Sequence, residues 1–591
     1  MIKMVYRSKK GRIAAAVSGI ALLCGTSCVK TDGTLGQDYI PSSHIWKVAT
    51  AEVELKDIEM VRASEIGGYN SRRVTIGAIL DDDFGWSERS SAFPLLPLVD
   101  TSSFKLGEDA VCTGFHFALA KDTLSFREES QEHIIQNIRI YELLKPLDDE
   151  ILYSGEQYDG LYDPAEGIIT EGVPTYNGGD SLSFNFKKEF GQKYLDALKD
   201  MKLGSTADYA EKLPGIYMTA DRTTGSGRLD LFKVAVGTDE YNYLTGNYAK
   251  LNYRATFDER GPIDTSIIFV AGLSSMIGSQ TSSVPTQYAF NFSKSEQLKA
   301  EGPATDRIYI EGGSGLKPVI RASRLKETIE EVIAAKMAEE IKGFDELSDV
   351  EKDKAIRERL DQIIVNRATL VLPYEHSDNY EEVSKYPKIL SPTCRLLAKR
   401  TVENEDGTEK EQEIVTFAGL TDASVSSENQ GNINRSMNRY QPDISHHAQE
   451  LIRLGQADGE SDEDYAKRVA SYDIWLLIMH PETTTTSNNN DSSYNDYLNA
   501  LAYSSYYNNL YGYGGYGGYG YGYGGYGYGY DSYYNNYYNY MMMAQYAQSG
   551  STTTTSSTEL DKDRYYNCRL TGPEAAERQP SIKITFSFPK E

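Results

Sequence analysis

The sequence predicts a mainly β protein: an antiparallel, β-sandwich-like body with helical insertions and a low-complexity Tyr/Gly-rich insert. Three observations support this fold class. Short segments rich in apolar and β-branched residues alternate in polarity, as half-buried strands do. Turns of Gly, Asp, Ser and Pro separate these segments, which favours antiparallel neighbours over long parallel crossovers. Helical periodicity is confined to a few stretches between the strands.

The chain begins with the organisation of a bacterial secretory signal. Basic residues precede an uncharged run at 13–23, and small residues follow the run. A run of about eleven residues is well short of the roughly twenty that span a bilayer, so we expect no permanent transmembrane helix here. Residues 1–27 are therefore predicted to be a lipoprotein signal peptide.

Cys28 is the predicted site of lipid attachment. Ser27 precedes it, whereas cleavage before Cys24 would place Leu23 where signal peptidases need a small side chain. Several acyl chains on one thiol would make the membrane attachment effectively permanent. The polar, Gly-bearing residues 28–45 are then a tether. The alternative is an ordinary secretory signal with two incidental cysteines.

The first part of the β-rich body is predicted at residues 46–322. Two short helices, at 189–199 and 205–212, are expected to interrupt its strands, and Pro214 with Gly215 ends the second helix. The strands are predicted at 45–55, 73–80, 114–119, 138–143, 216–218, 229–234, 251–255 and 266–270.

Residues 323–366 are predicted to form a helical hairpin inserted between strands. Apolar residues recur there at spacings of three and four, and Ser348 with Glu351 forms a capping box for the second helix. Because the outer faces are dense in charged residues, we expect a solvated hairpin rather than a membrane or partner helix. The apolar face of the first helix comprises Leu325, Ile329, Val332, Ile333, Met337 and Ile341.

The second part of the body is predicted at residues 367–482, and closing C-terminal strands at 559–591. Helices are expected near 444–455 and after Ser461, which with Asp464 resembles a cap. Strands are predicted at 369–373, 473–479 and 582–588.

A Thr-flanked, Tyr/Gly-rich insert is predicted at residues 483–558. Thr runs at 483–486 and 552–555 flank a tract whose centre, 511–530, consists of Tyr and Gly. Such a tract cannot pack a core, because it lacks aliphatic side chains and Gly raises the entropic cost of order. Since β-branched Thr favours extended backbone, the two runs are predicted to pair as an exposed ribbon.

The Tyr side chains of the insert are candidate binding residues. Each offers an apolar face with a polar tip, which suits contact with sugar or protein, or a position at a membrane–water interface. The alternative is a low-complexity loop with no specific role. The residues chosen are Tyr511, Tyr513, Tyr516, Tyr519, Tyr521 and Tyr523.

Composition excludes some classes of partner. The formal net charge of −26 argues against nucleic acid and against adsorption to anionic lipid, which leaves the acyl anchor as the predicted membrane attachment. Cys112, Cys394 and Cys568 are widely spaced and form no Cys-x-x-Cys pair. At most one disulfide is possible, no zinc site is indicated, and free buried thiols are predicted.

No motif predicts catalysis. The trigram at 83–85 lacks every accompanying kinase motif, and the Gly-rich stretch 312–317 lacks the ending of a phosphate loop, so a tight turn is predicted there. The acids at 81–83 could hold calcium or form a solvated turn, but the EF-hand spacing is missing. Adjacent His446 and His447 diverge on a helix. With 86 acidic residues, a glycosidase pair is unreadable from sequence. We predict no catalytic residue, no metal site and no cofactor.

Several segments resemble one known family. They are residues 28–36, 79–85, 213–217, 308–315, 366–373 and 569–586. Together they resemble the Bacteroidota lipoprotein family catalogued as domain of unknown function 4270, over nearly the whole mature chain. The resemblance implies an envelope lipoprotein without established activity, and it confers no catalytic residues. In that phylum, Asp-Ser/Thr-apolar triplets often carry O-glycans, which implies candidate sites at Thr123 and Ser181; the alternative is that both triplets only start strands.

We therefore expect a non-enzymatic outer-membrane lipoprotein, at the cell surface in preference to the periplasmic face. The first hypothesis is an accessory or structural subunit of an outer-membrane β-barrel complex, for nutrient uptake or outer-membrane protein assembly. The second is a glycan-binding or adhesion lipoprotein that uses its Tyr-rich surface. An envelope enzyme is the third.

Overall fold

The computed structural model describes residues 46–589 apart from 71, 100–103, 123–133, 148–149, 201–205, 225, 239–243, 258–260, 273–286, 340, 342, 361, 378–379, 404–407 and 487–552. The predictions of a signal peptide, a tether and a Tyr-rich centre of the insert lie outside these residues. Within them the fold class is confirmed: the protein is mainly β, in several antiparallel sheets, one of which curls into a half-barrel.

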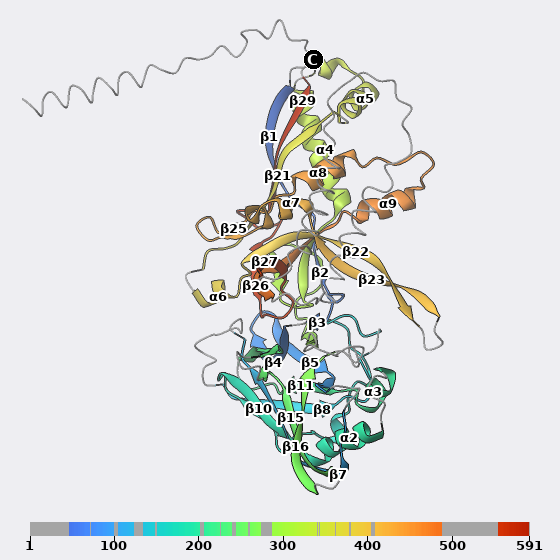
Figure 1. Ribbon diagram of the computed structural model, residues 1–591. Coiled ribbons are helices and arrows are strands. Elements are labelled where there is room, and N and C mark those ends of the chain that lie inside the picture. Colours follow the sequence, from blue (N-terminus) through green and yellow to red (C-terminus); the bar gives the residue numbers. More distant parts are fainter. Residues whose placement is uncertain are drawn as a thin grey trace, which may run out of the picture.

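Two sheets unite the first strands of the chain with its last ones (Figure 1). The five-stranded sheet has the order β1 (Trp46–Glu54), β29 (Ser581–Pro589), β21 (Ile364–Pro373), β25 (Arg439–Tyr440), β24 (Ile433–Asn434). The seven-stranded sheet has the order β18 (Gly302–Pro303), β2 (Ile58–Arg62), β20 (Leu316–Ile320), β26 (Ile474–Thr486), β22 (Ile389–Glu403), β23 (Glu409–Gly419), and β27 (Thr553–Leu560) pairs with β26.

Two further sheets are built from the chain between β2 and β18. The eight-stranded sheet has the order β12 (Gly227–Lys233), β4 (Arg73–Asp81), β5 (Gly85–Phe93), β11 (Ile216–Ala220), β8 (Gln136–Glu142), β9 (Thr175–Tyr176), and β17 (Ala289–Ser295) pairs with β5 and with β3 (Tyr69–Asn70). The other sheet has the order β10 (Ser181–Phe186), β7 (Glu108–Ala120), β15 (Ala249–Thr256), β16 (Pro262–Ala271), β6 (Leu95–Pro97).

Two-stranded pairs and helices complete the described residues. The pairs are β13 (Val236–Thr238) with β14 (Leu244–Gly246), and β19 (Arg307–Glu311) with β28 (Asn567–Thr571). The helices are α2 (Lys188–Asp200), α3 (Thr206–Lys212), α4 (Ala322–Ala338), α5 (Asp349–Leu360), α6 (Tyr380–Ser384), α7 (Thr421–Val425), α8 (Ser445–Arg453) and α9 (Asp462–Ala470).

The molecule has two large hydrophobic cores, one at each end (Figure 1). The first lies among β1, β20, β21, β26 and β29 together with α4 and α8. The second is rich in aromatic rings: Phe115 on β7 contacts Phe186, Phe190 and Phe269 with ring centroids between 4.7 and 6.1 Å apart. The buried residues of the second core all lie between Val74 and Ala289, so this core is built from one continuous stretch of the chain.

Most predicted elements are present near their predicted bounds. The caps are confirmed as well: Ser348 and Glu351 bond reciprocally at the start of α5, and the Ser461 hydroxyl accepts the N–H of Asp464 at the start of α9. The prediction of a solvated hairpin at 323–366 is wrong for its first helix. The apolar face of α4 is buried in the first core, because that face packs against β1, α8 and α9 rather than water.

Candidate interaction site

The two Thr runs pair, as predicted. Strand β26 continues past the seven-stranded sheet and pairs antiparallel with β27, from Met479 opposite Leu560 to Thr486 opposite Thr553. We call this two-stranded extension the ribbon. It leads out to residue 486 and back from residue 553, so the whole Tyr/Gly tract leaves and re-enters the body through one point.

The base of the ribbon is held by ion pairs to the eight-stranded sheet. Arg72 lies 2.8 Å from Glu559 and 3.6 Å from Glu482, and Arg73 pairs with Glu482 and, at 3.0 Å, with Asp122. Burial lowers the pKa of Arg73, but the surrounding carboxylates, Asp122 foremost, outweigh this and raise it above its ordinary value. The Arg73 side chain is 12 % exposed, so solvent screens these pairs little. We call these five residues the clamp.

The segment that follows β27 continues this attachment. Asp563 is buried and accepts hydrogen bonds from the side-chain amides of Asn70, on β3, and Asn291, on β17. Burial raises the pKa of Asp563 despite the nearby cations. Lys562 donates to the carbonyl oxygens of Gly67 and Tyr69. The return strand of the ribbon is therefore joined directly to a buried polar contact between the two ends of the molecule.

The Gly-rich stretch 312–317 forms the predicted tight turn, closed by the N–H of Gly315 on the carbonyl of Gly312 at 3.2 Å. The turn surrounds a lysine instead of a phosphate: Lys317 Nζ donates to the carbonyl oxygens of Glu311, Gly313 and Gly315 at 2.5–3.1 Å. Lys317 is 1 % exposed, and burial lowers its pKa to about 7.

Gly313 is required at this turn. Its φ is +59°, in the left-handed region, and a Cβ there would lie 2.2 Å from Ser293 Oγ and 2.5 Å from a guanidinium nitrogen of Arg89. Burial lowers the pKa of Arg89 to about 10. The turn is thus a packed part of the polar contact between the two ends.

The acids at 81–83 are neutralised by protein cations. Asp83 lies 2.5 Å from Arg569, and Asp81 lies 3.6 Å from Arg569 and 3.8 Å from Lys385. The Asp81 carboxylate also accepts the N–H of Asp83 at 2.9 Å. The expectation of a solvated turn is therefore wrong for Asp81, which is 8 % exposed. Within the described residues, no group of three or more His, Cys, Asp or Glu side chains is arranged to hold a metal ion.

Two histidines are buried in structural roles. His447 on α8 bonds through Nε2 to the carbonyl of Tyr472 at 2.9 Å, and burial lowers its pKa to about 4. His480 on β26, near the base of the ribbon, contacts Arg564 at 3.0 Å; burial first, and then that cation, lowers its pKa to about 4. Both imidazoles are therefore neutral near pH 7, and each contacts a neighbouring polar group inside the protein.

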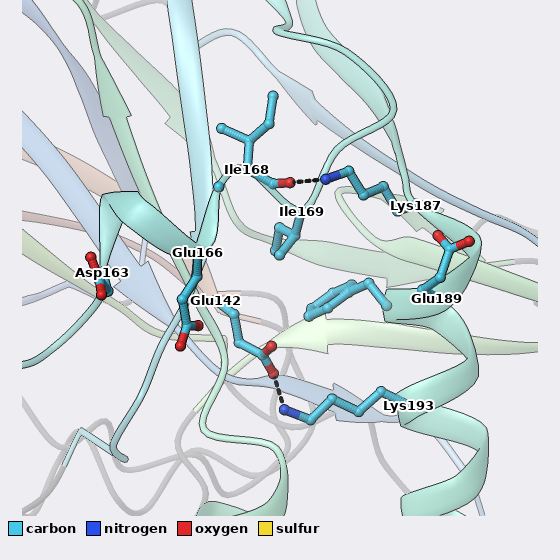
Figure 2. Close-up of a pocket in the computed structure, with 10 residues that line it drawn as sticks. Glu142, Asp163, Glu166, Ile168, Ile169, Lys187, Glu189 and Lys193 are labelled. Atoms are coloured by element: carbon cyan, nitrogen blue, oxygen red, sulfur yellow. Dashed lines mark hydrogen bonds and ion pairs between the residues drawn. The ribbon is translucent and has the colours of Figure 1, made fainter.

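A groove of about 260 Å³ opens between α2 and the loop that follows β8 (Figure 2). Four of its polar side chains are engaged with their neighbours: Lys193 bonds Glu142 at 2.5 Å, Lys187 donates to the carbonyl of Ile168 at 2.6 Å, and Asp163 caps a short turn. A second groove, of about 450 Å³, lies beside β15 and β16 and is lined by both polar and apolar residues. In the first groove the carboxylate of Glu142 is therefore neutralised by the ammonium of Lys193.

The structure describes few of the predicted site residues. Cys28, Thr123 and the six candidate tyrosines lie outside the described residues. Ser181 is exposed at the start of β10, opposite Ala120 on β7, and Asp180 before it is exposed too. In the other triplet Asp122 is buried and holds Arg73 in the clamp. The two triplets look alike in sequence, but the acid of one, Asp180, is exposed and the acid of the other, Asp122, is buried.

Sequence reasoning missed the clamp and the residues that extend it. Their signal was weak: Arg72 and Arg73 are adjacent cations just before a strand, and Glu482 and Glu559 are lone acids that flank the Thr runs. The pairing of the two runs, once assumed, places both acids at the base of the ribbon. The cations that meet these acids are far away in the sequence: Arg73 and Glu482 are 409 residues apart.

The chain matches no family model, no curated protein and no solved structure. Among the helices that the structure describes, none combines the length and the apolarity needed to cross a bilayer.

Proposed function

We propose that the protein is a lipid-anchored envelope lipoprotein that acts by contact rather than by catalysis, as an accessory subunit of an outer-membrane β-barrel complex. In this proposal acyl chains on Cys28 hold the body at the outer membrane, facing the cell surface, and the Tyr/Gly insert makes the contact. The sequence of the first 28 residues and the resemblance to the Bacteroidota lipoproteins support the anchor; the construction of the ribbon supports the contact.

The observation that carries the proposal is the fixed base of the ribbon. A loop without a role needs no rigid support, whereas the ribbon is held by three carboxylate–guanidinium contacts and by the buried Asp563 shortly after it. Buried ion pairs are weak contributors to net stability, but they favour one geometry over others. Such a base fixes the direction in which the paired residues 483–486 and 553–556 leave the body.

A contact role also fits the way in which the buried ionisable side chains are bonded. In the described residues, the buried carboxylates of Glu311 and Asp563 and the ammonium of Lys317 are bonded within the protein rather than turned toward a groove. General acid–base or nucleophilic chemistry needs such groups within hydrogen-bond reach of a substrate.

Affinity purification from detergent-solubilised membranes tests the proposal. We expect the full chain to recover a β-barrel partner, and a variant in which a short Gly-Ser link replaces residues 487–552 to lose it while keeping its fold. The matched control shortens the charged turn of the β22–β23 hairpin at 404–407 and should retain the partner. A monodisperse monomer from the full chain would refute the subunit role, and loss of the partner in both variants would refute the role of the insert.

A glycan-binding or adhesion function is the second candidate, favoured by the Tyr-rich composition of the segment that joins β26 to β27 in the sequence. Tyr rings stack on apolar sugar faces. Binding to a glycan array that is lost on removing residues 510–540, or on changing Tyr511, Tyr516 and Tyr521 to Ser, would support it. An array without any binding by the full chain would eliminate it.

We also propose Ser181, rather than Thr123, as the better O-glycan acceptor of the two triplets. Both Asp180 and Ser181 are exposed, whereas Asp122 is buried in the clamp and cannot face an enzyme. Intact-mass spectrometry of the native protein and of Ser181→Ala should differ by one glycan. Equal masses after allowing for the lost oxygen would contradict this assignment.

A further inference from the structure

The outer face of the β1–β29–β21 sheet changes character along its strands. Pairing of the three strands places Val48, Ser587 and Ile364 in one row across this face, with Trp46 opposite Pro589 in the row beyond. Trp46, Val48 and Ile364 are 43 %, 65 % and 44 % exposed. These three apolar side chains form what we call the apolar corner.

The next rows of the same face are polar. Thr50 and Thr585 bond to each other at 3.0 Å beside Arg367, which is 70 % exposed and 3.6 Å from Asp443. The row after that sets Glu52 opposite the exposed Lys583. The face is therefore apolar at one end and charged at the other, with a long cation at the boundary. This order matches a surface that dips into a bilayer interface, where Trp is favoured and Arg reaches the headgroups.

The apolar corner also lies where the chain enters the body. Trp46 begins β1, at the end of the molecule that carries β29 and α5 (Figure 1). Seventeen residues, 29–45, lie between the predicted acylation site Cys28 and Trp46. A polar linker of that length has a root-mean-square span of about 23 Å. The anchor thus keeps this end of the body beside the lipid at high effective concentration, so weak contacts suffice.

We propose that the apolar corner is a membrane-contacting surface, which seats this end of the body in the headgroup region of the bilayer that holds the Cys28 acyl chains. The inference rests on the anchor in the proposed function. It goes beyond the anchor, because it fixes which end of the body meets the lipid. The second core, at the other end of the molecule, then lies farthest from the membrane.

The occupant is lipid rather than a second copy of the chain. The full chain has a formal net charge of −26, and removal of the basic residues 1–27 makes the mature chain more negative still, so two copies repel each other. A zwitterionic bilayer carries no such net charge. β1 is the edge of its sheet, with its alternate residues Ala49, Ala51 and Val53 packed on the first core, so the apolar corner has no described protein layer over it.

Fluorescence of the anchored chain tests the proposal. The mature chain from Cys28 is coupled through that thiol to a maleimide lipid in phosphatidylcholine vesicles; Cys112, Cys394 and Cys568 are buried and should not compete. The Trp46 signal is isolated as the difference between the chain and its Trp46→Phe variant. We expect it to shift to the blue on coupling and to fall at least twofold in vesicles with brominated acyl chains.

Two variants with matched chemistry sharpen the result. Val48→Asp should abolish the quenching, whereas Val111→Asp, at a 58 % exposed position on β7 at the other end, should leave it unchanged. An unshifted, unquenched Trp46 in the coupled chain would overturn the proposal, as would a dimer with buried Trp46 in sedimentation. Because the chain is attached to the vesicle chemically, this experiment tests the apolar corner whether or not Cys28 is acylated in the cell. Acylation of Cys28 is tested separately, by mass spectrometry of the native protein.

Discussion

At the scale of single residues, the buried polar groups between the two cores are the most consequential. Asp563 replaces its hydration with bonds from two distant segments, through Asn70 and Asn291, and Lys317 replaces its own with three carbonyl oxygens of the turn that precedes it. A buried charge whose partners are removed keeps its desolvation cost and loses its compensation. Residues of this kind are therefore where single substitutions should have their largest effects.

Replacing Asp563 by Ala should lower the free energy of unfolding by about 3–5 kcal/mol, because the side-chain amides of Asn70 and Asn291 lose this acceptor and the nearby cation of Lys562 loses a buried counter-charge. Urea denaturation followed by circular dichroism measures this. The control is Asp264→Ala, whose carboxylate pairs with Arg254 in full exposure and should change little. Equal effects of the two substitutions would contradict the assignment.

Lys317 should make stability depend on pH. Burial lowers its pKa to about 7 in the folded protein, against about 10.4 in the unfolded chain. Between these values the unfolded chain binds more protons, so stability rises with pH, by at most about 1.4 kcal/mol per unit. Denaturation from pH 6 to 10 should show this slope in the native sequence and lack it in Lys317→Met. The exposed Lys467→Met is the control; parallel curves for all three proteins would contradict the prediction.

At the scale of elements, α4 and the ribbon illustrate opposite relations to the body. α4 is amphipathic, and its apolar face completes the first core. The ribbon leaves the seven-stranded sheet and is paired only with itself beyond the clamp. Loss of α4 packing should therefore destabilise the whole molecule, and opening of the ribbon should not.

Truncating Ile333 on α4 to Ala should reduce the free energy of unfolding by about 2–5 kcal/mol, since the side chain is fully buried and leaves a cavity. Val350→Ala on α5, at a 79 % exposed position, should change it by less than about 0.5 kcal/mol. A small effect at Ile333 would mean that α4 is a solvated helix after all.

Proline at Thr484 and Thr555, which face each other in the ribbon, should open it without affecting the body. Proline removes the N–H that the ladder needs. Hydrogen exchange followed by mass spectrometry should then show faster exchange at 483–486 and 553–556, with Tm unchanged. The double Thr→Ala variant keeps its N–H groups and should exchange more slowly than the proline variant. A large drop in Tm would show that the ribbon supports the body.

At the scale of the whole molecule, stability comes from two cores and the polar contact between them rather than from covalent links. Cys112, Cys394 and Cys568 are free and buried, as the sequence predicted. Burial raises the pKa of Cys568 and of Cys112, which makes both thiols unreactive. The fold is therefore independent of redox conditions.

A reductant should leave Tm unchanged, and a thiol reagent should modify none of these three cysteines in the native protein. After unfolding in denaturant the same reagent should modify all three, and mass spectrometry counts the adducts. Modification of one of them in the folded state, or a Tm that falls under reduction, would contradict the prediction.

The sequence by itself determined the fold class, the caps of α5 and α9, the buried thiols and the pairing of the two Thr runs. These features follow from local properties: polarity alternation, side-chain hydroxyls at helix starts, and β-branched runs that favour extended backbone. The tertiary structure alone decided that β1 pairs with β29, where Trp46 lies opposite Pro589, and that α4 belongs to a core. It also decided that Arg73 meets Glu482 and that three carbonyl oxygens enclose Lys317. The β1–β29 pairing, the packing of α4 and the Arg73–Glu482 contact join segments far apart in the chain. The Lys317 contacts lie within six residues, but their turn is packed only where Ser293 and Arg89 close on it in the folded protein.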